Sequence, residues 1–354
     1  MASPTRRLAP WLLAAALTPT ALAAEELESV TLAVVGTWSG LPLHQEFERP
    51  FWTEHLPEAS GGAVTVNLTT FDQMGVDGAD VFRLLDDGVF DIGATVADYT
   101  VADAPELEGL DVPLVATEAT AARAMVEAAR PMVEDIMADR FGAQLLAIAP
   151  YPPQIVFCNT EIATLADLEG LEIRGSGRMT TNFLEALGAE GINLDFAEVP
   201  GALERGVIDC AITGSGSGYS AGWWESSTHL MTLPLGGWDA VVTAMNRERF
   251  EELSDDMQAF LAEQIATAFE APAWDAAAGA LEEDIACLTG DGDCPRGEAA
   301  SMVRVEPTAE DRALARRVLE ETVLPQWAER VGADWARRWN ESVGAVVDVA
   351  IPLD

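Results

Sequence analysis

A short buried strand that ends on an arginine is the stretch of this sequence best suited to bind a small charged molecule. Residues 167–178 read DLEGLEIRGSGR, and Ile173 with its apolar neighbours predicts a strand ending at Arg174. Gly175, Ser176 and Gly177 then allow a tight bend before a helix that begins near Met179. A guanidinium in this position offers a planar, two-pronged donor to an anion. A structural ion pair with one of the chain's many acids is the alternative interpretation.

The charge of the chain excludes several classes of function. Its 354 residues suffice for about two domains, and they include 20 basic residues, all arginine, against 59 acidic ones, a net charge of −39. Such a chain repels nucleic acid and anionic membrane surfaces. The lack of lysine excludes a Walker-type phosphate loop, a pyridoxal Schiff base and a lysine nucleophile.

The first residues resemble an export signal. Arg6 and Arg7 precede an apolar run from Leu8 to Ala24, which contains the small-x-small pattern at residues 21–23. We therefore expect residues 1–24 to be a signal peptide cleaved near Ala23, and the mature chain to be exported without inserting into a membrane. An uncleaved anchor is the alternative, which two prolines in the apolar run disfavour.

Four cysteines in an exported chain predict two disulfides. Cys287 and Cys294 flank a polar loop and are expected to pair locally. Cys158 and Cys210 lie in two apolar strands, and we expect them to pair across those strands. Buried free thiols are the alternative. A zinc site is not expected, because the three histidines stand at no ligand spacing to the cysteines. We expect no cofactor and no other metal.

The order of apolar segments predicts an α/β fold with two lobes. Strands at 30–35, 64–68 and 90–95 alternate with helices, which favours mostly parallel sheets covered on both faces. Two long extended runs, 144–158 and 240–246, are better explained as crossings between lobes that form a hinge. We therefore assign residues 25–150 plus 240–280 to lobe I and 151–239 plus 281–354 to lobe II.

Further elements are expected after the crossings. A glycine- and serine-rich loop is predicted at 214–224, and a long amphipathic helix at 253–281. Another helix is expected to start at Thr308, with a capping box to Asp311, and to run to Pro325.

Ligands of parallel α/β sheets bind beyond the carboxyl ends of the strands. This rule places Trp38, Gln73 and the loop that ends at Tyr99 around one crevice. Trp238 also lies near a predicted loop end, where packing in the core is an equally good explanation.

A hydrolase is the competing functional class. Residues 218–222 match the G-x-S-x-G nucleophile elbow around Ser220. The last histidine, His229, follows only nine residues later, which does not suit that fold. A catalytic carboxylate pair is possible by number, but nothing selects two of the 59 acids.

Taken together, several motifs resemble the periplasmic solute-binding subunit of tripartite ATP-independent periplasmic (TRAP) transporters, the DctP family. The motifs lie at Leu165–Arg174, Leu187–Ala189, Phe196–Leu203 and Gly206–Asp209, with Gln73-x-Gly75 and Gly88–Gly93 upstream. The resemblance implies a non-enzymatic type II periplasmic binding protein with two lobes. Its ligand would be a small organic acid and its partner a TRAP permease in the membrane; we expect a monomer rather than a dimer.

The same resemblance assigns roles to residues. It implies that Arg174 clamps a ligand carboxylate, that Phe196 packs on the ligand and that Thr213 helps to hold it. Members that bind sialic acid use a second arginine, and this chain has none between Phe141 and Ile173. We expect Arg178 and Gln154 to assist Arg174, with Ser215 as a further polar contact. The identity of the ligand does not follow from the resemblance.

Overall fold

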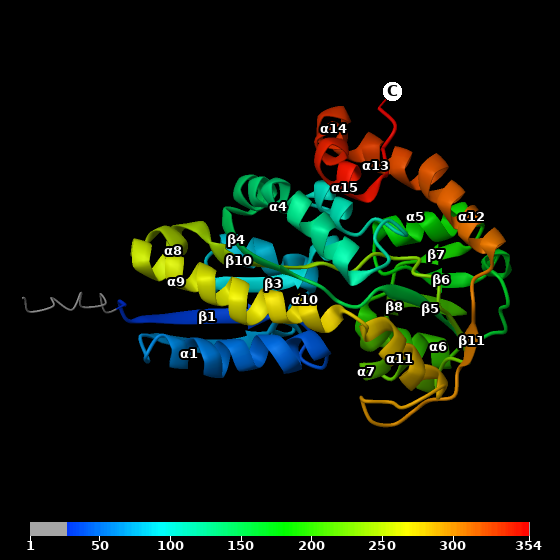
Figure 1. Ribbon diagram of the computed structural model, residues 1–354, viewed down its shortest axis with the longest axis horizontal. Coiled ribbons are helices and arrows are strands. Elements are labelled where there is room, and N and C mark those ends of the chain that lie inside the picture. The colour runs from blue at the N-terminus through cyan, green and yellow to red at the C-terminus, as the bar shows by residue number, and fades with distance from the viewer. Residues whose placement is uncertain (1–26, 354) are drawn as a thin grey trace, which may run out of the picture.

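The computed structural model describes residues 27–353, so the predicted signal peptide lies outside the described residues. The chain forms two α/β lobes side by side, each built on one mixed sheet with helices against it (Figure 1). No helix among these residues combines the length and apolarity needed to cross a membrane. The predicted two-lobed α/β fold is confirmed.

The first sheet has the strand order β2-β1-β3-β10-β4. β1 pairs in parallel with β2 and β3, whereas β10 is antiparallel to both β3 and β4. β3 and β10 are buried along their whole length, as expected of central strands covered on both faces. The strands are β1 (Val30–Gly36), β2 (Val64–Thr70), β3 (Ile92–Val96), β4 (Ala143–Ala149) and β10 (Val241–Asn246).

The second sheet has the order β11-β9-β5-β8-β6-β7. β8 is parallel to β6 and antiparallel to β5, and both β5 and β8 are buried throughout. The strands are β5 (Gln154–Cys158), β6 (Glu172–Arg174), β7 (Glu190–Ile192), β8 (Cys210–Gly214), β9 (His229–Met231) and β11 (Val303–Val305).

The helices cover these sheets and connect the lobes. Those of the first half are α1 (Leu56–Ala59), α2 (Phe71–Met74), α3 (Val81–Asp86), α4 (Ala119–Phe141), α5 (Arg178–Ala186), α6 (Val199–Glu204) and α7 (Ser215–Ser220). Those of the second half are α8 (Arg247–Glu251), α9 (Asp255–Ile265), α10 (Ala271–Ala277), α11 (Ala280–Thr289), α12 (Ala309–Val318), α13 (Leu324–Val331), α14 (Ala333–Trp339) and α15 (Ala345–Val347).

The predicted crossings are present. The run 144–158 forms β4 in the first sheet and β5 in the second, and the chain returns to the first sheet as β10. The chain passes between the lobes a third time at Gly279, which separates α10 from α11. Gly279 adopts φ +88°, a conformation that suits glycine. The segment 309–347 packs first on lobe II and then on α4 (Figure 1). The exact lobe boundaries stay a prediction.

Three expected elements differ from the prediction. The helix expected at 253–281 runs from Asp255 to Ala277 with a π-helical turn at 266–270, and the break at Gly279 separates it from α11. The glycine- and serine-rich stretch is not a loop: it forms α7, which packs on α11, and the 3₁₀ turn η8 (Trp223–Glu225). Small side chains permit that close packing, which outweighs the poor helix propensity of glycine. The helix from Thr308 has the expected capping box but does not end at Pro325. A π-helical turn, η10 (Leu319–Val323), precedes the proline, and the helix continues as α13.

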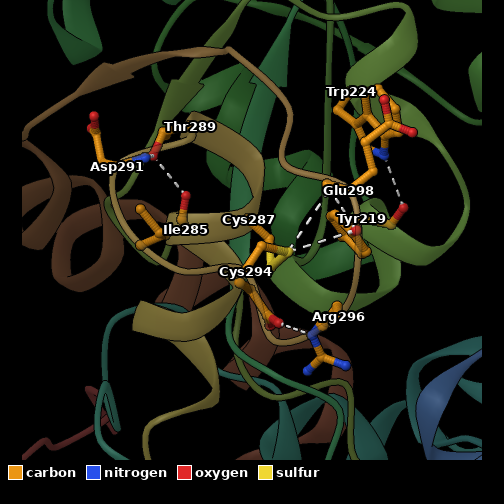
Figure 2. Close-up of a disulfide and its surroundings, with 10 residues drawn as sticks. Tyr219, Trp224, Ile285, Cys287, Thr289, Asp291, Cys294, Arg296 and Glu298 are labelled. Carbon is orange, nitrogen blue, oxygen red and sulfur yellow. Dashed lines mark hydrogen bonds and ion pairs between the residues drawn. A yellow bond between two sulfur atoms is a disulfide. The ribbon is translucent and has the colours of Figure 1, made fainter.

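Both predicted disulfides are present. Cys158 and Cys210 face each other on the antiparallel pair β5 and β8, with Cα atoms 4.0 Å apart. Cys287 and Cys294 close the short loop after α11, and Tyr219 contacts this disulfide from α7 (Figure 2). Both bridges lie within what was predicted to be lobe II.

Candidate functional site

Arg174, the last residue of β6, is buried between the two lobes with only 3% of its surface exposed. Its Nε donates to the carbonyl oxygen of Leu194 at 3.0 Å and its Nη1 to that of Ile212 at 2.9 Å. Among the residues that the structure describes, Nη2 makes no hydrogen bond and no carboxylate forms an ion pair with the guanidinium. The backbone therefore fixes this cation while part of its donor capacity is unused.

Acidic side chains lie near the guanidinium without contacting it. Burial lowers the pKa of Arg174, while the nearby Tyr99, Asp239 and Asp98 act in the opposite direction. Asp98 follows β3 in the 3₁₀ turn η4 (Ala97–Thr100), and Asp239 precedes β10. Both adjoin strands of the first sheet, whereas Asp195, which acts on Arg174 in the same direction, belongs to lobe II.

Asp98 is the least satisfied group of the site. It is 5% exposed, and neither carboxylate oxygen has a hydrogen-bond partner among the described residues. Burial raises the pKa of Asp98 to about 7, and the negative charges of Glu108 and Asp239 add to the effect, whereas Arg178 and Arg174 oppose it. Two buried acceptors without donors are costly, so the group is suited to meet a donor that the chain itself does not supply.

Asp239 and Asp111 extend this acidic cluster. Burial raises the pKa of Asp239 to about 7 in spite of Arg174, and its Oδ1 is buried without a hydrogen bond. Asp239 also adopts φ +40°, which is unusual for a residue other than glycine. Asp111 is better satisfied, because its oxygens accept from the backbone N–H of Asp239 at 2.8 Å and from Nε2 of Gln154 at 2.9 Å.

Aromatic rings from both lobes close over the same region. The ring centroids of Trp38, from the loop after β1, and Phe196, from the 3₁₀ turn η7 (Phe196–Glu198), are 5.4 Å apart. The indole N–H of Trp38 donates to the hydroxyl of Tyr99 at 3.2 Å. Behind Phe196 lies Trp223, at 5.3 Å between centroids. Trp38, Tyr99 and Phe196 are therefore in one aromatic group with members from both lobes.

An ion pair also joins the lobes. Arg178, at the start of α5, contacts Glu108 of the 3₁₀ turn η5 (Pro105–Leu110) at 3.2 Å. Arg330 of α13 pairs with the other oxygen of the same carboxylate. Glu108 is fully buried, whereas the side chain of Arg178 is 39% exposed. Arg178 thus neutralises an acid of the protein in this conformation.

The structure does not bring every predicted site residue to Arg174. Gln73 lies exposed on α2. Trp238 is buried, and its N–H donates to the carbonyl oxygen of Ala116 at 2.6 Å. Ser215 donates to Asp284 at 2.6 Å, on the side of α11. Thr213 is buried on β8, one residue after the carbonyl that holds Arg174.

Sequence reasoning missed Asp98, Asp239 and Asp111. Nothing in their local sequence separates them from the other acids of a chain that contains 59. The one usable signal was position, since Asp98 and Asp239 are direct neighbours of the predicted site residues Tyr99 and Trp238. Strong burial of an acid depends on tertiary packing, which no local pattern records.

The residues of the hydrolase alternative do not form a catalytic arrangement. Ser220 is exposed at the carboxyl end of α7, whereas an elbow serine lies on the turn between strand and helix. The imidazole of His229 is hydrogen-bonded to Thr228 instead. Within residues 27–353 no cluster of His, Cys, Asp or Glu has the geometry of a metal site.

Two hollows on the described part of the chain lie away from Arg174. One of about 760 Å³ is on lobe II beside Asn159 and Asp209, and one of about 520 Å³ lies between Tyr151, Tyr219 and Arg296. Near Arg174 the two lobes are in contact through Trp38 and Phe196 and through Glu108 and Arg178. The described conformation is therefore a closed one at this position.

Comparisons with known proteins agree with this architecture. The family model of bacterial extracellular solute-binding proteins, family 7 (DctP), matches residues 38–289. A curated relative, the uncharacterized protein y4mM of Sinorhizobium fredii, is 28% identical over 165 residues, which are 45% of this chain and 29% of that protein. The chain thus spans less than a third of that relative's length.

Solved structures match over nearly the whole chain. DctP7 of Bordetella pertussis, an extracytoplasmic solute receptor that binds pyroglutamic acid, has a TM-score of 0.78 at 20% identity, covering 90% of this chain and 100% of its own. A marine metagenome TRAP solute-binding protein specific for pyroglutamate has a TM-score of 0.76 at 21% identity, covering 91% and 98%. The periplasmic ectoine-binding protein of Halomonas elongata has a TM-score of 0.77 at 18% identity, covering 90% and 99%.

Proposed function

Because the chain belongs to family 7 of the bacterial extracellular solute-binding proteins, the DctP family, we propose that it is the periplasmic receptor of a TRAP transporter. It captures a small organic acid between its lobes and delivers it to a permease in the membrane. Proteins of this family and fold are solute receptors and not enzymes. The predicted signal peptide agrees with a periplasmic location.

The observation that carries this proposal is the state of Arg174. A guanidinium that is 97% buried and held by two backbone carbonyls, and that no carboxylate of the described chain contacts, has a charge without a direct ion-pair partner. Leaving a buried charge unpaired costs several kcal/mol. A ligand carboxylate that accepts from Nη2 would remove most of that cost, and the fixed guanidinium would need no rearrangement to receive it.

The aromatic contact between the lobes supports capture by closure. Trp38 and Phe196 meet from opposite lobes, and Arg174 is itself buried, with 3% of its surface exposed. An ion pair is stronger where water is absent, so the same carboxylate would bind more tightly in the closed form than in an open cleft. Two of the structural relatives bind pyroglutamic acid, a small acid, which agrees with a site that contains a buried cation.

The direct test is the substitution Arg174→Gln in the mature protein. A thermal-shift screen of small mono- and dicarboxylates, sugar acids and amino acids identifies binders, and calorimetry then measures the dissociation constants. We expect Arg174→Gln to weaken every binder by about two to four orders of magnitude, the equivalent of roughly 3–5 kcal/mol. Arg337→Gln, at an exposed surface ion pair, is the matched control and should bind as the parent does. Equal affinity of Arg174→Gln and the parent protein would refute the clamp.

A test of delivery completes the experiment. The loaded receptor should support uptake of the same acid into vesicles that contain the cognate membrane subunits, and Arg174→Gln should not. If the vesicles take up the acid equally well without the receptor, this chain is not the receptor of that transporter.

A further inference from the structure

Next to the proposed carboxylate clamp lies a second, oppositely charged half of the site. Asp98 presents two buried carboxylate oxygens without donors, and Asp239 presents one. Both side chains are close enough to Arg174 for their charges to act on its pKa. Arg174 Nη2, for its part, is a donor without an acceptor in the described chain. Unused acceptors and an unused donor thus lie in one closed region, but no hydrogen bond joins them.

The charges of this region do not favour a simple anion. Three arginines (Arg174, Arg178, Arg330) face four carboxylates (Asp98, Glu108, Asp111, Asp239). Glu108 alone occupies two of the arginines, Arg178 and Arg330. Because burial already raises the pKa of Asp98 and of Asp239 to about 7, a ligand that brought only a carboxylate would favour the protonated form of both acids further, whereas a ligand with a cationic N–H group would favour the ionised form, which accepts hydrogen bonds.

The backbone around Asp98 is shaped for its carboxylate. A β-carbon on Gly177 would lie 1.1 Å from Oδ2 of Asp98, so only a glycine allows the carboxylate to lie against the turn that follows Arg174. Likewise, a β-carbon on Gly237 would lie 2.3 Å from Oδ1 of Asp111. These two glycines allow the acids of the first lobe to reach the segments that border the site.

We propose that the ligand is amphoteric: a small acid whose carboxylate binds Arg174 and whose cationic N–H group, an ammonium or amidinium, donates to Asp98 and Asp239. This inference rests on the proposed function and adds the chemical class of the ligand. A quaternary ammonium would neutralise the charge but would leave the acceptors without hydrogen bonds. An inorganic cation is disfavoured because the described residues form no cluster with metal-site geometry.

Pairs of similar acids with and without an N–H group test the contribution of Asp98 and Asp239 apart from that of Arg174. L-Proline, tetrahydrofuran-2-carboxylate and proline betaine share a five-membered ring and a carboxylate, but carry an ammonium with N–H, an ether oxygen and a dimethylammonium, respectively. 4-Aminobutyrate and butyrate form a second pair with a longer spacing. Calorimetry of the mature protein measures each dissociation constant in sodium-free buffer and again with added Na⁺ or Ca²⁺.

We expect at least one N–H-bearing acid to bind, and to bind about tenfold or more tightly than its partner without N–H. Asp98→Asn and Asp239→Asn should weaken that acid about tenfold or more and change its partner by less than about twofold. Asparagine preserves the side-chain shape and tolerates the positive φ of Asp239. The thermal midpoint of each empty variant reports whether it is folded.

Several results would overturn the inference. These are equal affinity for both members of every pair, no binding by any N–H-bearing acid, or unchanged binding in both asparagine variants. Binding of plain carboxylates only with added Na⁺ or Ca²⁺ would assign the acids to an inorganic cation instead. The proposed function fails separately, when a binder retains its affinity for Arg174→Gln, whatever its preference between the paired probes.

Discussion

Trp38 of lobe I and Phe196 of lobe II are in contact, with ring centroids 5.4 Å apart and planes inclined by 48°. Trp38 also packs edge-on against Phe71 at 4.8 Å, and Phe196 packs against Trp223 at 5.3 Å. Each ring is therefore backed by its own lobe, and the contact between them exists only while the lobes are closed. It couples closure of the protein to the shape of the site.

Phe196→Ala should weaken binding of the ligand while leaving each lobe folded. Removing a buried phenyl ring leaves a cavity and deletes the interlobe contact, and such truncations cost roughly 3–5 kcal/mol when the site cannot collapse. Because the lobes can move apart and reduce that cost, we expect the affinity for the ligand to fall by only about ten- to a hundredfold. Calorimetry measures the loss, and Phe196→Leu, which retains most of the volume, should lose less. A larger loss in the leucine variant would contradict this role.

The two disulfides should differ in their effect on stability. The bridge Cys158–Cys210 closes a loop with a sequence separation of 52, and Cys287–Cys294 one of 7. The chain-entropy model then gives about 4 kcal/mol for the first and about 2.5 kcal/mol for the second. Urea unfolding of the two double valine variants measures the difference. A greater loss for the short loop would show that contacts of the loop, such as that with Tyr219, dominate its contribution.

Much of the fold could be predicted because its signals are local. The β6 strand that carries Arg174 follows from apolar residues and a turn glycine, and the pairing of Cys158 with Cys210 follows from their places in two apolar strands. The helix α7 could not be predicted, because Gly and Ser favour loops and only the packing on α11 makes this stretch helical.

The site could be predicted only in part for a similar reason. Arg174, Trp38, Tyr99 and Phe196 come together because the ends of strands meet at the junction of the lobes. Asp98 and Asp239 are far apart in the sequence, and their burial arises only when β3 and β10 pair. A chain with so many acids gives no local sign of the few that tertiary structure buries.

Asp98→Asn should alter how stability depends on pH. The native protein holds the pKa of Asp98 at about 7, against an ordinary value of 3.8 in the unfolded chain. Between about pH 4 and pH 7 the native state therefore binds more protons than the unfolded state, and this group's contribution to stability falls as the pH rises, becoming constant above pH 7. Asparagine removes that penalty, so the variant should exceed the parent in stability by more at pH 8 than at pH 5.

Urea unfolding at both pH values measures this difference for the empty protein. Asp293→Asn, in an exposed loop, is the control and should differ from the parent equally at both pH values. The groups that face Asp98 are Glu108, Asp239, Arg178 and Arg174, so the same comparison in Asp239→Asn tests whether the two acids titrate together. A constant stability difference between Asp98→Asn and the parent would show that Asp98 is ionised throughout this range.

Gly177→Ala should prevent complete closure of the lobes. Gly177 has φ −156° and ψ −168°, an extended conformation that alanine also adopts, so the backbone itself is not strained. The added β-carbon would lie 1.1 Å from Oδ2 of Asp98 on the opposite lobe, and the lobes must separate to avoid that overlap. We expect affinity for the ligand to fall about tenfold or more, and the radius of gyration with ligand present to remain that of an open form.

Gly40→Ala provides the matched control, since a β-carbon there meets no atom within 4 Å. Small-angle scattering on both variants, with and without the acid identified in the screen, reports whether the lobes close. Calorimetry on the same samples measures the affinity for that acid. The empty Gly177→Ala protein should have a thermal midpoint within a few degrees of that of the parent, because the lobes can move apart to relieve the clash without unfolding. If Gly177→Ala binds and compacts as Gly40→Ala does, then Asp98 moves away from the turn after Arg174 when the ligand is bound, and the two residues do not form part of the loaded site.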